Sequence, residues 1–326
     1  MLAAFVTRTD ADDPISALQV GERPAPDVPE GWARVRLKAA GLNHHDLWSL
    51  RGVGLPDERL PMILGCDGAG LDDDGNEVIV HAVISGDPVG LIPTGDETLD
   101  PRRSLLSEVH QGTLADEVIV PKANLVPKPA GLSWEEAACL PTAWLTAYRM
   151  LFTQGQVRPG QTILVQGAGG GVATALIALG RAAGVRVWVT SRDEGKRTRA
   201  VQLGADRAFE SGARLPERVD AVMETVGAAT WSHSVKSLKP GGAIVICGAT
   251  SGAAPKNAEL NRIFFLQLRV LGSTMGTREE LGRLANFLLT SGVRPQIDTV
   301  LPLERAREGF EKLASGDVVG KVVFTR

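Results

Sequence analysis

A glycine-rich segment in the middle of the chain has the composition of a turn that binds phosphate groups. The apolar run at 162–166 (TILVQ) is followed by GAGGG at 167–171 and then by a helix-forming stretch. A strand, a glycine turn and a helix start in this order bring backbone N–H groups and the positive end of a helix close to a pyrophosphate, because no Cβ atom blocks the approach. The usual G-x-G-x-x-G spacing is met only with alanine at two of its positions, and a tight turn without a ligand is the alternative. The segment predicts a dinucleotide site whose contacts come from Gly169, Gly170, Gly171 and Val172.

The residues after the next apolar run bear on which dinucleotide is bound. Ser191 stands where NAD-binding enzymes usually carry a carboxylate for the ribose hydroxyls, and Arg192, Lys196 and Arg197 follow it. Small polar and basic groups suit the 2′-phosphate of NADP. Asp193 argues the other way, since its carboxylate could bind the ribose, and the basic residues could simply be solvated charges at a helix start. We expect NADPH rather than NADH, with Ser191, Arg192 and Lys196 among the contacts.

A parallel sheet would position these residues, and the second half of the chain shows the alternation of strand-like and helix-like segments that is typical of one. Ser133 and Glu136 form a capping-box pattern that opens a helix, and beyond it β-branched apolar runs alternate with helical stretches. The expected strands are 162–166, 186–190, 220–224 and 243–247, and the expected helices are 171–183, 194–203 and 231–238. Such alternation predicts βαβ units, with helices on both faces of a parallel sheet.

The two ends of the chain show a different pattern of predicted secondary structure. Up to about residue 125, short apolar runs with strand-like alternation, such as 33–37, are separated by Gly, Pro and Asp residues. Near the C-terminus we expect helices at 278–290 and 305–314 and a final strand at 321–324. The first part therefore predicts a mainly β domain, and the fold class of the whole chain is α/β.

The composition fits a two-domain protein that binds neither nucleic acid nor membranes. The chain has 326 residues, a net charge of −3 and a pI near 6.0, so it lacks the basic surface that either partner would need. No apolar run approaches the roughly 20 residues of a membrane span. No charged leader precedes an apolar core at the N-terminus, so we expect no signal peptide. Three scattered cysteines argue against a disulfide framework and for a reducing cytoplasm.

Six segments, in the same order and over nearly the whole chain, resemble the medium-chain dehydrogenases/reductases, and most of all their zinc-free quinone oxidoreductase branch. They are AAGLNHHDLW at 39–48, LPMILGCDGAG at 60–70, GTLAD at 112–116, LTAY at 145–148, GSTM at 272–275 and GKVV at 320–323. The resemblance implies a GroES-like β domain made of residues 1–127 with 257–326, and a Rossmann dinucleotide-binding domain of residues 128–256. It also implies a cleft for the nicotinamide and a homodimer formed through edge strands of the Rossmann sheet.

Zinc-dependent members of this family place Cys, His and Cys around the cleft, and this chain departs from that pattern. The matching residues are Asn43, Cys66 and Thr142. Zn²⁺ in a catalytic site needs three protein donors besides water, and one thiolate with an amide and a hydroxyl does not supply them. The family's four-cysteine structural zinc lobe is also missing, since residues 84–112 contain no cysteine. We expect no zinc, although an improvised site stays open from His44, His45, Cys66 and Asp67.

Without a Lewis acid, oxidation of simple alcohols is a weak candidate, and reduction of conjugated acceptors is a stronger one. A quinone or an α,β-unsaturated carbonyl compound accepts hydride from NADPH at an already electrophilic carbon, while the enzyme positions the substrate and stabilises the enolate oxygen. Asn43 would orient the carbonyl of this small-molecule substrate, and His45 would donate a proton near neutral pH. A His45 that only lines the cleft, with water as the donor, is the alternative. Trp48, at a position where quinone reductases often carry tyrosine, cannot serve as an acid.

The resemblance also assigns cofactor contacts outside the glycine segment. His44 and Lys321 match positions where the family has basic residues near the pyrophosphate, and Thr146 matches one that faces the nicotinamide amide. The remaining matches, on later strands and the returning loop, are Val226, Gly227, Cys247, Gly248 and Thr274. Two other functions stay open: an alcohol or aldehyde oxidoreductase that uses an improvised metal, and a non-catalytic NADPH-binding protein.

Overall fold

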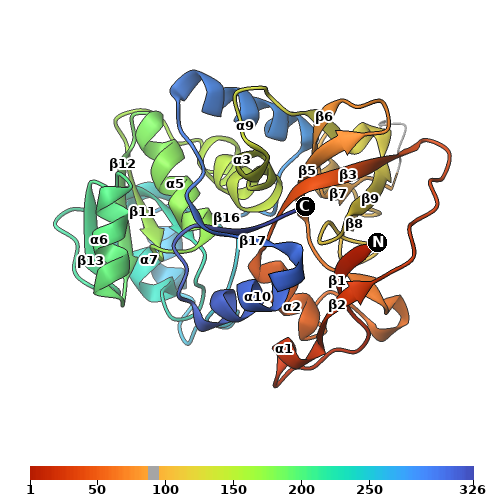
Figure 1. The fold of residues 1–326 in the computed structure, drawn as a ribbon. Coiled ribbons are helices and arrows are strands. Elements are labelled where there is room, and N and C mark those ends of the chain that lie inside the picture. Colours follow the sequence, from red (N-terminus) through yellow and green to blue (C-terminus); the bar gives the residue numbers. More distant parts are fainter. Residues whose placement is uncertain (87–94) are drawn as a thin grey trace. The chain divides into compact units, whose positions relative to one another are not determined.

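The computed structural model describes residues 1–86 and 95–326, which form two compact units (Figure 1). The first unit combines residues 1–145 with residues 275–326, and the second comprises residues 146–274. Both ends of the chain thus fold together in the first unit. The α/β fold class is confirmed by the sheets and helices of the two units.

The first unit is built around a seven-stranded sheet in which strands from both ends of the chain are neighbours. The order is β10-β6-β5-β3-β18-β17, and β9 also pairs with β3. These strands are β3 (Trp32–Gly41), β5 (Asp67–Asp72), β6 (Glu77–Val80), β9 (Glu117–Pro121), β10 (Leu125–Pro127), β17 (Ile297–Pro302) and β18 (Lys321–Thr325). The alternating run becomes a strand because Val35 and Leu37 are buried while Arg36 between them is exposed. The expected final strand is β18, which runs antiparallel to β3 with Phe324 opposite Ala40.

Smaller sheets and short helices complete the first unit. The strands are β1 (Leu2–Val6), β2 (Leu18–Glu22), β4 (Met62–Ile63), β7 (Val83–Ile84) and β8 (Ser104–Leu105). The helices are α1 (Pro14–Ala17), α2 (His44–Leu50), α3 (Trp134–Ala138), α9 (Arg278–Ser291) and α10 (Ala306–Ser315), with the π-helical turn η4 (Leu140–Trp144) and the 3₁₀ turns η1 (Asp57–Arg59), η2 (Glu97–Leu99), η3 (Lys122–Asn124) and η6 (Leu303–Arg305). Helices α9 and α10 confirm the two expected near the C-terminus. The capping box of Ser133 and Glu136 opens α3 as expected.

The second unit holds a six-stranded parallel sheet, as the alternation of strands and helices predicts. In the order β13-β12-β11-β14-β15-β16, the strands are β11 (Thr162–Gln166), β12 (Arg186–Ser191), β13 (Arg207–Glu210), β14 (Val219–Glu224), β15 (Leu238–Ile246) and β16 (Arg269–Gly272). The helices are α5 (Gly171–Ala182), α6 (Glu194–Gln202), α7 (Trp231–Ser237) and α8 (Leu260–Phe265), preceded by the π-helical turn η5 (Arg149–Gln154); α4 (Leu145–Tyr148) lies at the border with the first unit.

The packing of β11 and α5 shows why this part of the chain folds as a doubly wound sheet. Every residue of β11 is buried, as expected for a central strand that is covered on both faces. Gly180 allows α5 to lie close to the sheet, because a Cβ there would be only 2.8 Å from the side chain of Val187. Among the helices of residues 1–86 and 95–326, none combines the length and the apolar character that crossing a membrane requires.

Candidate active site

The glycine turn lies where the sequence places it, at the carboxyl end of β11. Gly167 has a φ of 92°, a conformation that residues with a side chain rarely adopt. Gly170 is the N-cap of α5, and a Cβ there would meet no atom within 4 Å, so its backbone faces open space. A glycine cap supplies no side-chain acceptor, which leaves the first N–H groups of the helix for a ligand. The expected contacts lie in this turn and at the start of α5, at Gly169, Gly170, Gly171 and Val172.

The loop after β12 arranges the residues expected to discriminate NADP from NAD. Asp193 is the N-cap of α6, and its carboxylate accepts a hydrogen bond of 2.7 Å from the backbone N–H of Lys196. The hydroxyl of Ser191 accepts one of 3.1 Å from the backbone N–H of Asp193. Arg197 donates to the carbonyl of Ser191 at 2.7 Å and braces the loop, while Arg192 is exposed. Asp193 therefore has a structural role of its own, which weakens the alternative that it binds the ribose.

A buried carboxylate fixes the loop after β14. Glu224 is fully buried and accepts hydrogen bonds from the backbone N–H groups of Val226 at 2.8 Å and Gly227 at 3.0 Å, and from the hydroxyl of Ser234 at 2.6 Å. Gly227 has a φ of 92°, and a Cβ there would be 2.6 Å from the carbonyl oxygen of Gly252. The loop that carries two of the expected cofactor contacts is thus held in one conformation from inside the second unit.

The other expected cofactor contacts are distributed over both units. Cys247 and Gly248 directly follow β15, and burial raises the pKa of the Cys247 thiol to about 12, so the sulfur is neutral. Thr146 is buried at the start of the second unit, and Thr274 is exposed at its end. His44 is exposed in the first turn of α2. Whether each of them touches a cofactor stays a prediction.

In the first unit, the structure joins Asn43 to a buried ion pair. Lys321 Nζ is 2.7 Å from Asp67 Oδ2, and it also donates to Asn43 Oδ1 at 2.6 Å and to the carbonyl of Leu42 at 2.7 Å. The amide of Asn43 in turn donates to Asp67 Oδ2 at 2.8 Å. Gly41 makes room for this cluster, since a Cβ there would be 2.8 Å from Asp67 Oδ2. All three donors of Lys321 have protein acceptors, so a phosphate contact, as expected from the sequence, would have to displace one of them.

The positions that bind zinc in zinc-dependent members do not supply a metal site here. The amide oxygen of Asn43 faces the ammonium of Lys321, so a second cation at that oxygen would be repelled. Thr142 lies in η4, and among the described residues its buried hydroxyl oxygen has no hydrogen-bond partner; a neutral hydroxyl is in any case a poor zinc ligand. Cys66 is the one soft donor of the three. Zinc does not fit these positions.

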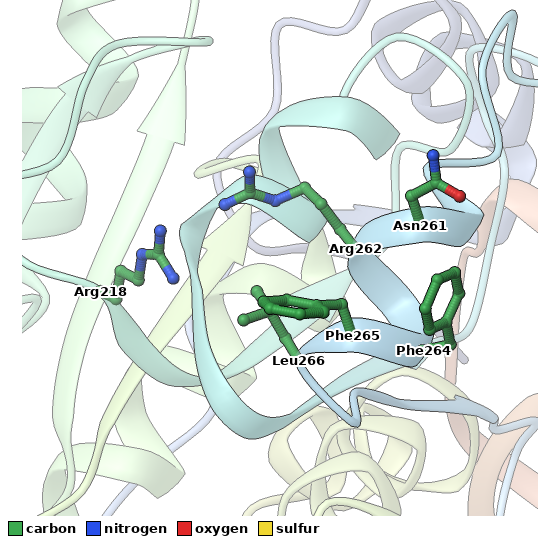
Figure 2. Close-up of a pocket in the computed structure, with 6 residues that line it drawn as sticks. All are labelled: Arg218, Asn261, Arg262, Phe264, Phe265 and Leu266. Carbon is green, nitrogen blue, oxygen red and sulfur yellow. The ribbon is translucent and has the colours of Figure 1, made fainter.

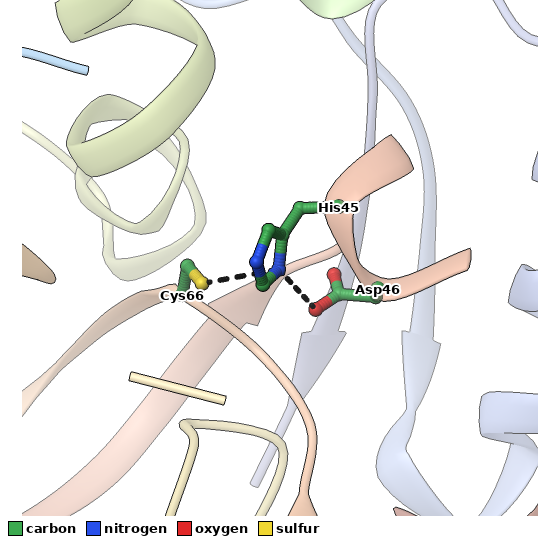
Figure 3. A group of neighbouring side chains, drawn as sticks. All are labelled: His45, Asp46 and Cys66. Atoms are coloured by element: carbon green, nitrogen blue, oxygen red, sulfur yellow. Dashed lines mark hydrogen bonds and ion pairs between the residues drawn. The ribbon is translucent and has the colours of Figure 1, made fainter. Parts of the chain in front are cut away.

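A second cluster lies at the start of α2, around His45 (Figure 3). Its Nε2 is 2.8 Å from Glu108 Oε1, and its Nδ1 is 3.5 Å from Cys66 Sγ and 3.9 Å from Asp46 Oδ1. Cys66 and Asp46 are fully buried, whereas 22% of the His45 side chain is exposed. The imidazole therefore connects a buried thiol and carboxylate to the surface of the unit.

The charges around His45 favour its protonated form. Burial disfavours the imidazolium, but contacts with the carboxylates of Asp46 and Glu108 favour it, and the pKa of His45 lies well above its ordinary value. Burial also raises the pKa of Cys66, whose thiol donates to the carbonyl of Leu106 at 3.2 Å. A partly exposed imidazole that carries a proton is the form that acid catalysis requires.

Comparison with known proteins identifies the family. One family model, for the alcohol dehydrogenase GroES-like domain, matches residues 29–130, and another, for zinc-binding dehydrogenases, matches residues 171–290. A zinc-type alcohol dehydrogenase-like protein of Schizosaccharomyces pombe is 30% identical over 90% of this chain and 90% of its own length. The chain belongs to the medium-chain dehydrogenase/reductase superfamily.

Two further known proteins match almost the whole length of this chain. The acryloyl-coenzyme A reductase of Sulfurisphaera tokodaii is 27% identical over 95% of this chain and 97% of its own length. A solved NAD-dependent alcohol dehydrogenase is 34% identical, covers 100% of both chains and has a TM-score of 0.90. The predicted pair of a GroES-like and a Rossmann domain is confirmed, and the protein is a nicotinamide-dependent oxidoreductase.

The site contains residues that the sequence did not single out. Glu108 is 63 positions from its partner His45, and Lys321 is 254 positions from Asp67, so neither pairing has a local signal. Glu224 is different, because its backbone contacts, with the N–H groups of Val226 and Gly227, lie only two and three residues away.

Proposed function

We propose that this protein reduces α,β-unsaturated carbonyl compounds or quinones by hydride transfer from NADPH, without zinc. One observation carries the proposal. Asn43 occupies a zinc-ligand position of the family, and its side chain is hydrogen-bonded to Lys321 and Asp67. Since the residues there do not make a Lewis-acid site, an acceptor that conjugation has already activated is favoured over a simple alcohol. The relative from Sulfurisphaera tokodaii is named for such an acceptor, since acryloyl-coenzyme A is an α,β-unsaturated thioester.

His45 is the proton donor in this proposal. Hydride transfer to the β-carbon places negative charge on the carbonyl oxygen, and a proton completes the reduction. The imidazole is partly exposed and is oriented by its 2.8 Å contact with Glu108. Asn43 is proposed to bind the substrate carbonyl. Its amide N–H points to the carbonyl of Gly41 at 3.5 Å, the longest of its hydrogen bonds and the one most easily exchanged for a substrate oxygen.

NADPH is the proposed cofactor because of the loop after β12. Ser191 leaves room for a 2′-phosphate, Arg192 is exposed beside it, and the carboxylate of Asp193 is occupied with capping α6. The solved relative named as NAD-dependent makes a direct comparison of both cofactors part of the test. A kcat/KM higher with NADPH than with NADH supports the proposal, and the reverse order contradicts it.

The deciding experiment follows NADPH consumption by the full chain with an enone, a 2-alkenal, a quinone and an enoyl thioester. The matched controls are the saturated ketone, aldehyde and thioester of the same length. Turnover of the conjugated compounds alone supports the proposal. The second candidate is an alcohol or aldehyde oxidoreductase, which the names of two relatives favour. It would instead give turnover of NADP⁺ with simple alcohols, and tight NADPH binding without turnover of any compound would mean a non-catalytic protein.

We also propose that the protein is a homodimer in which β16 pairs with its copy. Strand β16 lies at one end of the sheet order, so one of its edges pairs with no strand of residues 1–86 and 95–326. The neighbouring α8 exposes Leu260, Phe264 and Phe265, which are 68%, 69% and 78% exposed. The two phenylalanines line a pocket together with Arg218 and Arg262 (Figure 2), and this pocket has a volume of about 420 Å³. Light scattering should give twice the chain mass, and Phe265→Glu should reduce it to that of a monomer.

A further inference from the structure

Three side chains of different chemistry converge at the start of α2. One ligand atom of each of His45, Asp46 and Cys66 lies within 4.8 Å of the other two (Figure 3). The Nδ1 atom of His45 is 3.5 Å from the sulfur and 3.9 Å from Asp46 Oδ1. His45 and Asp46 are neighbours on α2, whereas Cys66 directly precedes β5. In the reduction proposed above, Asp46 and Cys66 act only through His45 and do not contact the substrate.

The two separations from Nδ1 of His45 are close to those between the ligands of a tetrahedral zinc ion. With Zn–S near 2.3 Å and Zn–N and Zn–O near 2.0–2.2 Å, tetrahedral angles place sulfur and nitrogen about 3.6 Å apart, and nitrogen and oxygen about 3.4 Å apart. The observed sulfur–nitrogen distance of 3.5 Å agrees with the first value. The nitrogen–oxygen distance of 3.9 Å exceeds the second by about half an ångström, which a small rotation of the imidazole can close.

The surroundings already hold the ligands in place. Glu108 contacts Nε2 of His45 at 2.8 Å, which leaves Nδ1 facing the cluster, and carboxylates occupy this place behind metal-binding histidines. Asp46 is fixed through both oxygens, since the backbone N–H of Gly65 donates to Oδ1 at 3.0 Å and that of Asn43 to Oδ2 at 2.8 Å. Little side-chain freedom is therefore left to lose when a cation binds.

We propose that His45, Asp46 and Cys66 bind one divalent cation of the zinc class. The site shares Cys66 with the zinc-dependent pattern of the family but takes its other two donors from α2. An imidazole, a carboxylate and a thiolate suit Zn²⁺ and Co²⁺, whereas Mg²⁺ and Ca²⁺ prefer oxygen donors alone. On binding, Nδ1 of His45 and the Cys66 sulfur each give up a proton to solvent and donate a lone pair to the metal. Three protein donors leave a fourth position for water.

A cation at this site inhibits the enzyme, a consequence that rests on the function proposed above. Coordination through Nδ1 occupies one nitrogen of His45, and the other is held by Glu108. The one N–H that the coordinated imidazole keeps, at Nε2, is donated to Glu108 and is not available to the reduced substrate. The cation and the catalytic proton exclude each other, so the site would make reduction sensitive to zinc.

Cobalt tests the site without reference to activity. Co²⁺ added to chelator-treated full chain should bind in one equivalent and give the near-ultraviolet band of a cobalt–thiolate bond, together with the visible bands of a tetrahedral ion. Since this measurement uses the unaltered chain, it does not depend on a variant that folds. If no thiolate band develops at any Co²⁺ concentration, the proposal is wrong.

Variants assign the ligands. Cys66→Ala should abolish the thiolate band, and Glu108→Gln should weaken Co²⁺ binding by about 10- to 100-fold, the usual effect of losing a carboxylate behind a metal-bound histidine. Cys139→Ala is the matched control, since Cys139 is an equally buried cysteine, and the band should survive that change. A band that persists in Cys66→Ala, or disappears in Cys139→Ala, overturns the assignment.

Inhibition separates this proposal from the proposed function. Zn²⁺ should lower NADPH-dependent enone reduction at the concentration at which it displaces Co²⁺, and Cys66→Ala should remove that sensitivity. A cobalt band in a protein that reduces no conjugated acceptor supports the metal site and refutes the function. Enone reduction without a cobalt band supports the function and refutes the site.

Discussion

Replacing Lys321 by methionine leaves the buried carboxylate of Asp67 without the ammonium that neutralises it. The two side chains are 2% and 0% exposed, and their charged atoms are 2.7 Å apart. The ammonium also donates to the carbonyl of Leu42 and to the amide oxygen of Asn43, so the variant loses three hydrogen bonds together with the charge. Methionine keeps most of the length of the lysine stem, and packing around it changes little.

The expected loss of stability is large because Asp67 cannot reach water. Removing one partner of a buried ion pair costs about 3–5 kcal/mol, most of it from the charge that stays behind. For a domain of this size, 1 kcal/mol corresponds to about 2–4 °C, so the melting temperature should fall by roughly 6–20 °C. Thermal unfolding followed by far-ultraviolet circular dichroism measures the change. A melting temperature within about 2 °C of the parent's would refute the reasoning.

Two controls separate charge from packing. Asp67→Asn combined with Lys321→Met removes both charges and should recover at least half of the stability lost in the single variant. If the double variant is as unstable as the single one, the loss comes from packing and the charge argument fails. Lys239→Met breaks the half-exposed pair with Asp220, at 2.9 Å, and should cost less than about 1 kcal/mol.

Three further predictions follow from the second unit and from β17. Arg192→Ala should weaken NADPH binding roughly 10- to 150-fold, which corresponds to the about 1.5–3 kcal/mol of a hydrogen bond to a charged group, and leave NADH binding unchanged in titrations monitored by fluorescence. Arg199→Ala, an exposed arginine on the following helix α6, should change neither. Glu224→Gln should weaken the binding of NADPH and NADH equally, because it loosens the loop after β14 and not the contact with the 2′-phosphate. A change in the ratio of the two dissociation constants would contradict that role. Burial opposes ionisation of Asp298, but hydrogen bonds from Lys312 and other donors lower the pKa of this carboxyl below its ordinary value of 3.8. Its contribution is therefore complete above that pH and is lost as pH falls through the lower, folded value, so the stability difference between the parent and Asp298→Asn in urea unfolding should shrink below about pH 4.

Local pattern was enough to predict the elements that bear the cofactor turn. The β-branched run before the glycines became β11, and the Ala-rich stretch after them became α5, because each segment carries its own periodicity. The same holds for α9, which opens with a capping box of Thr277 and Glu280 and ends at Gly292 with a φ of 73°. These signals are confined to a few consecutive residues, and no distant contact is needed to interpret them.

The candidate site was less predictable because its contacts are long-range. Lys321 matched a phosphate-contacting position of the family, and only the pairing of β18 with β3 brings its ammonium to Asn43 and Asp67. Glu108 lies in an irregular segment with no periodicity, and its partner is known only once the sheet is formed. Helix α8 was missed for a different reason. Its phenylalanines point outward, so they lack the one-sided burial that marks an amphipathic helix.

The charges of the two clusters explain why a cation would bind at one and not at the other. At Asn43, the carboxylate of Asp67 is already matched by Lys321, and a metal ion would add uncompensated positive charge to a buried site. Around His45, the carboxylates of Asp46 and Glu108 contribute two negative charges, against at most one positive charge on the imidazole. A divalent cation that replaces that proton and the proton of Cys66 leaves the cluster, Glu108 included, with the same net charge of one negative unit as the imidazolium form, so binding it buries no uncompensated positive charge. A metal ion is therefore electrostatically more favourable at the neighbouring turn of α2 than at Asn43.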